Sequence, residues 1–68
     1  MADIGKFVDK AYEGKDFAAL AAAPVSALQG VSDGDAAALK SAFGIDTIAE
    51  LANNKFVRWA QAITTLSN

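Results

Sequence analysis

The chain has 68 residues, a formal net charge of −2, and neither cysteine nor histidine. Its length predicts one domain over residues 1–68, and its slight acidity gives no electrostatic reason to bind nucleic acid or an anionic membrane. Without cysteine there is no disulfide or thiolate ligand, and without histidine the commonest general base and metal ligand is missing. We therefore expect a protein that is not an enzyme and that holds no cofactor and no metal.

The longest apolar run, Phe17 to Val25, is far shorter than the ~20 residues of a membrane span. Asp3 and Lys6 interrupt the apolar run that a secretory signal would need near the N-terminus. We expect a cytoplasmic protein without a membrane partner.

The first predicted helix runs from Asp3 to Glu13, and Gly14 suits its end. Its apolar stripe consists of Ile4, Phe7, Val8 and Ala11.

Two shorter helices are predicted next. Asp16 fits the N-cap of a helix over Phe17–Ala22, because its carboxylate can accept from free amides of the first turn. Pro24 ends that helix, and its fixed φ suits the first position of a further helix over Val25–Gln29.

A hairpin and a capped helix follow. Gly30 and Val31 are expected to form the tight turn, and Ser32 to cap a helix over Asp33–Phe43. Asp35 lies three residues after Ser32, which is the spacing of a capping box.

Gly44 suits the end of that helix, after which Ile45 is expected to pack back. Asp46 is predicted to cap a helix over Thr47–Ala52.

Asn54 is predicted to cap the last helix, Lys55–Leu66. The spacing of its apolar stripe favours a core role for Trp59, between Phe56 and Ile63, over a contact with a partner. The fold class that follows is all-α, a compact bundle of five or six short helices.

The centre of the chain, from Val25 to Leu51 and at its limit to Ile63, resembles a helix-hairpin-helix domain. The matching positions are Leu28, Gly30, Val31, Ala36, Leu39, Phe43, Gly44, Ile45, Thr47, Ile48 and Leu51. The resemblance implies a central helix-hairpin-helix-like unit whose hairpin amides contact a DNA phosphate.

This sequence departs from that pattern at the phosphate site. Ser32 replaces the second hairpin glycine, and Asp33 and Asp35 follow it. Carboxylates at a helix N-terminus repel the phosphate that the helix end attracts, so we expect the hairpin to turn and cap the chain without binding nucleic acid.

The leading hypothesis is a small non-catalytic interaction module that binds another protein or itself. The alternative is a weak or partner-assisted DNA-binding module of the helix-hairpin-helix type. A chain this short hides its large apolar side chains poorly, so some are expected at an interface. The candidate interface residues are Ile4, Phe7, Tyr12 and Trp59.

Overall fold

The protein is all-α. The computed structural model describes residues 4–67, apart from the side chain of Ile4, and the described residues contain no β-strand. Within residues 4–67, four α-helices and three short 3-10 segments follow one another in the order η1 (Ile4–Phe7), η2 (Lys10–Tyr12), α1 (Phe17–Ala22), η3 (Val25–Ala27), α2 (Asp33–Phe43), α3 (Ile48–Asn53) and α4 (Lys55–Leu66).

The α-helices begin and end at residues whose local chemistry favours those positions. Asp16 caps α1 by accepting from the Ala19 amide at 2.7 Å. Asn54 caps α4 by accepting from the amides of the second and third helical residues, at 2.9 and 3.2 Å. Gly44 ends α2 in the left-handed conformation at φ 69°, which glycine adopts without a steric penalty. The bounds of α1, α2 and α4 are those that the sequence predicts.

The first predicted helix is wrong, because this part of the chain forms two 3-10 segments, η1 and η2, and not one α-helix. Asp3, where it was expected to begin, lies outside the described residues. Between η1 and η2 the backbone pairs with residues 27–29: the Asp9 amide donates to the Ala27 carbonyl at 2.7 Å, and the Gln29 amide donates to the Phe7 carbonyl at 2.8 Å. These bonds place Val8 in an antiparallel bridge with Leu28, so Val8 is buried as its apolar character predicts but by a paired backbone and not by a helix.

The segment from Ala23 to Gln29 lies between residues 7–9 on one side and residues 46–48 on the other. Only Val25–Ala27 is helical, as a single 3-10 turn, so the predicted helix over Val25–Gln29 is also wrong. On its other side the Val25 amide donates to the Asp46 carbonyl at 2.8 Å, and the Ile48 amide donates to the Ala23 carbonyl at 3.0 Å. Several backbone groups that a helix would bond internally therefore form hydrogen bonds with two neighbouring segments.

The core lies around this segment and contains aliphatic side chains, four of which are alanine or valine. Val25 and Ala27 are each 1% exposed, and Ile45 packs back after Gly44 to a 3% exposed position. The buried residues are Val8, Leu20, Ala23, Val25, Ala27 and Ile45. No described residue after Ile45 is buried.

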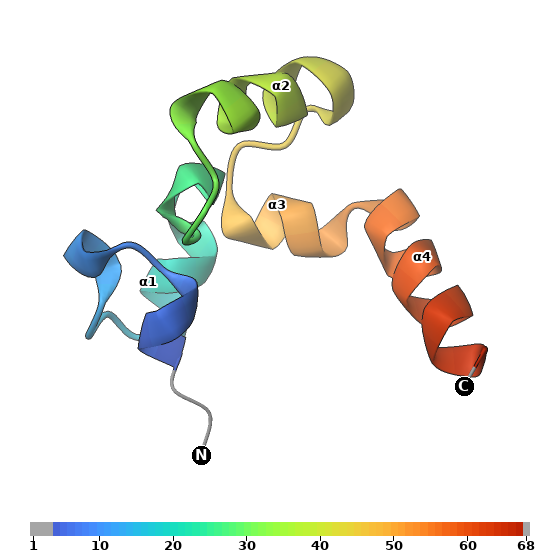
Figure 1. The fold of residues 1–68 in the computed structure, drawn as a ribbon, viewed down its shortest axis with the longest axis horizontal. Coiled ribbons are helices and arrows are strands. Elements are labelled where there is room, and N and C mark those ends of the chain that lie inside the picture. Colours follow the sequence, from blue (N-terminus) through green and yellow to red (C-terminus); the bar gives the residue numbers. More distant parts are fainter. Residues whose placement is uncertain (1–3, 68) are drawn as a thin grey trace.

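The arrangement is more open than the predicted compact bundle. The Cα radius of gyration is 12.9 Å, whereas a compact domain of this length has about 11 Å. In Figure 1, α4 extends away from α1 and α2, and α3 lies between α4 and α1. Among the helices, α4 packs mainly against α3. None of the helices in residues 4–67 combines the length and the apolar character that a membrane crossing requires.

Candidate interaction surface

Four of the seven exposed large hydrophobic side chains among the described residues lie on α4. We call these four residues the apolar face of α4: Phe56, Trp59, Ile63 and Leu66, which are 51%, 57%, 69% and 84% exposed. They are separated by three, four and three residues, so they lie on one side of the helix. On the α4 helix only Val57 is half-buried, and every other residue is exposed.

The preference for Trp59 as a core residue is therefore wrong. The stripe geometry that predicted burial is present, but no other element covers it, because α4 packs mainly against α3. Trp59 is one of the four candidate interface residues, and it is exposed on the apolar face of α4.

Phe43, at the end of α2, extends this face at its N-terminal end. The centroids of the Phe43 and Phe56 rings are 6.2 Å apart, and those of Phe56 and Trp59 are 5.7 Å apart in an edge-to-face arrangement. Both separations fall in the range of favourable aromatic pairs. The sequence shows the spacing along α4, but the contribution of Phe43 depends on how α2 and α4 meet.

The charges of α4 are all positive. Lys55 and Arg58 are its only charged side chains, whereas the rest of the chain carries four basic and eight acidic residues. Both cations lie in the first turn, where the helix dipole disfavours positive charge. The Lys55 ammonium lies 5.1 Å from the Phe56 ring centroid and 5.8 Å from that of Trp59, which offsets part of that penalty through cation–π attraction.

The other candidate interface residues lie apart from α4. Phe7 is 56% exposed on η1, and Tyr12 is half-buried on η2 with the Lys15 ammonium 6.0 Å from its ring centroid. The side chain of Ile4 lies outside the described residues. The blue segments η1 and η2 and the orange-to-red α4 lie on opposite sides of the molecule in Figure 1, so the four candidates do not form one surface.

The hairpin has the geometry that its residues favour. Gly30 adopts a φ of 93°, and the Val31 amide donates to the Leu28 carbonyl at 3.1 Å. Ser32 caps α2 by accepting from the Asp35 amide at 3.0 Å, and Asp35 accepts from the Ser32 amide at 3.2 Å. The expected capping box is therefore present, and it occupies two of the amides at the start of the helix.

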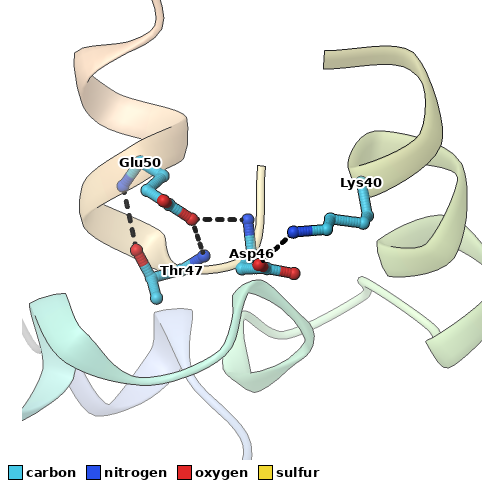
Figure 2. Close-up of polar contacts among 4 residues, drawn as sticks. All are labelled: Lys40, Asp46, Thr47 and Glu50. Atoms are coloured by element: carbon cyan, nitrogen blue, oxygen red, sulfur yellow. Dashed lines mark hydrogen bonds and ion pairs between the residues drawn. The ribbon is translucent and has the colours of Figure 1, made fainter. Parts of the chain in front are cut away.

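The predicted N-cap of α3 is wrong by one residue. Thr47, not Asp46, accepts from the Glu50 amide, at 3.1 Å, and Glu50 accepts in return from the Thr47 amide at 3.1 Å and the Asp46 amide at 2.7 Å (Figure 2). The spacing Thr47-Ile48-Ala49-Glu50 is a second capping box. This signal is visible in the sequence, and the glutamate three residues on favours the threonine over the aspartate.

Asp46 instead pairs with Lys40, whose ammonium lies 2.5 Å from Asp46 Oδ2 (Figure 2). The pKa of Lys40 is raised above its ordinary value, first by this hydrogen bond and then by the charge of the same carboxylate. Both side chains are more than half exposed, so the pair ties the end of α2 to the start of α3 without forming a buried site.

Residues 4–67 contain no group of three or more acidic side chains placed to hold a metal ion. Comparisons with protein-family models, with curated proteins and with solved structures each returned no match for this chain. The apolar face of α4, extended by Phe43, is therefore the feature of the described structure that most needs a functional explanation.

Proposed function

We propose that this protein is a small non-catalytic interaction module that binds another protein or itself through the apolar face of α4. The observation that carries the proposal is the exposure of Phe56, Trp59, Ile63 and Leu66 on one side of a single helix. Contiguous apolar surface of this kind is uncommon on monomeric proteins and marks interaction sites.

The composition of the surface supports the same proposal. Aromatic residues and arginine are enriched among the side chains that dominate binding energy at protein interfaces. Here the rings of Phe43, Phe56 and Trp59 lie next to one another, and the Lys55 ammonium lies near the rings of Phe56 and Trp59. The chain has neither histidine nor cysteine, on which most small catalytic sites depend.

A matched pair of variants tests which surface binds. Ile63→Asp places a carboxylate on the apolar face of α4, and Gln61→Asp places the same group on the opposite side of the same helix. Each variant and the unaltered chain is immobilised and exposed to native lysate, and the retained proteins are identified by mass spectrometry. We expect a species, another protein or this chain, that the unaltered chain and Gln61→Asp retain and that Ile63→Asp loses. Identical retention by all three would exclude the apolar face of α4 as the binding surface.

We also propose that the central helix-hairpin-helix-like unit, residues 25–51, has a structural role here. The support is electrostatic: Asp33 and Asp35 carry negative charge at the start of α2, where the resemblance implies a phosphate contact. The segment that would supply the first helix of such a unit contains only the 3-10 turn η3, which also argues for a turning role over phosphate binding.

The competing DNA-binding function has a direct test. We expect no binding of a fluorescently labelled duplex below ~100 µM protein at physiological salt, measured by fluorescence anisotropy. As a control, Asp33→Asn and Asp35→Asn together remove the repulsion and report whether the carboxylates suppress a residual affinity. Submicromolar binding that weakens steeply with salt would place DNA binding ahead of protein interaction.

A further inference from the structure

We propose that the apolar face of α4 pairs with the same face of a second copy of this chain, with the two α4 helices antiparallel around a two-fold axis. The inference rests on the proposed function and goes beyond it by naming the partner and the geometry of the contact.

The first support is the spacing of the four residues. Intervals of three, four and three residues are the heptad spacing by which two helices interlock their side chains. This order reads the same from either end of the helix, so an antiparallel copy presents a matching pattern. Phe56 then lies opposite Leu66 of the second copy, and Trp59 lies opposite Ile63 of the second copy. Each aromatic side chain therefore meets an aliphatic one, in both halves of the contact.

The second support is charge. Lys55 and Arg58 are the only charged side chains of α4, and both lie in its first turn. A parallel pair would bring the four cations of two copies together. An antiparallel pair places them beside the C-terminal end of the other helix, where the dipole is negative. The antiparallel arrangement thus compensates the cations that are unfavourable within one copy.

The third support is area. Large apolar side chains of this kind present of order 200 Å² each, so the exposed fractions of Phe43 and the four face residues leave roughly 600 Å² per copy. Complete coverage of this surface in two copies would bury at most about 1,200 Å² in total, which is the lower end of specific protein interfaces. The estimate predicts a reversible dimer of modest affinity. The C-terminal end of α4 projects away from α1 and α2 (Figure 1), and Ile63 and Leu66 near that end are 69% and 84% exposed.

Sedimentation equilibrium of the full chain from about 1 µM to 1 mM tests self-association. We expect a monomer–dimer equilibrium with a dissociation constant inside that range, as an interface at the lower end of the size scale implies. Ile63→Asp, which occurs twice at a two-fold contact, should weaken the dimer by at least ~100-fold because two unpaired carboxylates would be buried. Gln61→Asp should leave the dissociation constant within about threefold, because this position faces away from the contact. Helix content measured by circular dichroism checks that both variants are folded.

Cysteine cross-linking tests the orientation, and the natural absence of cysteine makes single variants unambiguous. Ala60 flanks the apolar face near the middle of α4, so in the antiparallel pair residue 60 of each copy lies close to the two-fold axis. We expect Ala60→Cys to form a disulfide-linked dimer readily under mild oxidation, and Gln61→Cys, on the outer side, to do so at least tenfold more slowly. In a parallel pair residue 60 of the two copies would lie on opposite sides of the contact, and this difference would vanish.

The outcomes separate this inference from the proposed function. A strict monomer at 1 mM, a dimer unaffected by Ile63→Asp, or equal cross-linking of the two cysteine variants each overturns the antiparallel pairing. If the chain is monomeric but retains another protein in a manner that Ile63→Asp abolishes, the proposed function stands and only the self-pairing is lost.

Discussion

The segment around Val25 and the helix α4 use apolar side chains in opposite ways. Residues 23, 25 and 27 are small, and the structure buries them almost completely between two neighbouring backbones. The apolar face of α4 carries much larger side chains, and the structure leaves them half to mostly exposed. The comparison shows that an apolar pattern predicts which side of an element is hydrophobic, but not whether another part of the chain covers that side.

The largest expected difference is in the free energy of unfolding when an isoleucine is replaced by alanine in each of the two regions. Ile45→Ala removes a buried side chain and should lower the free energy of unfolding by about 2–5 kcal/mol. Ile63→Ala makes the same chemical change on α4 and should alter it by less than about 0.5 kcal/mol. Urea unfolding followed by circular dichroism, at a protein concentration of ~1 µM or below to avoid association, measures both. Equal losses would mean that Ile63 is a core residue.

The caps of α2 and α4 should sharpen the contrast. Ser32→Ala removes the cap of a helix that contacts the packed region and should cost about 0.5–2 kcal/mol of overall stability. Asn54→Ala removes an equivalent cap from α4, but the loss should be seen as local fraying because α4 packs mainly against α3. Amide hydrogen exchange by NMR should therefore show faster exchange along α4 with little change in the global unfolding midpoint. A large drop in Tm for Asn54→Ala would show that α4 belongs to the cooperative core.

The start of α3 joins the two regions, and its cap offers a finer comparison. Thr47→Ala should cost about 1 kcal/mol, because the hydroxyl that accepts from the Glu50 amide is lost, whereas the backbone amide at position 47 can still donate to Glu50. Asp46→Asn should have a smaller effect on Tm, because the carboxylate serves an exposed ion pair and not the cap. Thermal unfolding of the two variants decides between them. A larger loss for Asp46→Asn would restore Asp46 as the cap.

The smallest expected effect is the pH dependence of the Lys40–Asp46 pair. Because the pKa of Lys40 is raised in the folded protein by the carboxylate, its contribution to stability is complete below the ordinary lysine pKa of about 10.5. The contribution is then lost as the pH rises through the higher pKa of the folded state. An NMR titration of the Lys40 side chain should give a lower pKa in Asp46→Asn than in the unaltered chain. Titration of Lys40 at the same pH in both would show that the pair does not form in solution.

Much of the helical pattern could be predicted from single residues. Asp16, Ser32 and Asn54 begin helices, and Gly44 ends one, because each satisfies or redirects backbone groups within a few residues of itself. Such signals depend only on neighbouring residues and can therefore be identified in the sequence. The error at Asp46 belongs to the same class, since the threonine and glutamate that cap α3 are only three residues apart.

The errors before residue 30 have a different cause. The stripe of the first segment and Pro24 before Val25 both fit a helix locally, yet the structure pairs these backbones with each other and with residues 46–48. Hydrogen bonds between segments compete with those inside a helix, and for short segments the local preference is too weak to decide. Burial at residues 23, 25 and 27 follows a period of two, but the run is too short to identify an extended segment in advance.

The sequence by itself determined that the chain is helical, where α1, α2 and α4 begin and end, and that α4 has one apolar side. These properties depend on residues within one or two turns of each other. Only the tertiary structure decided that small residues around Val25 form the core and that the apolar face of α4 stays open, with Phe43 joined to it. Coverage of a face depends on the path of the rest of the chain, because burial is set by neighbours that are distant in sequence.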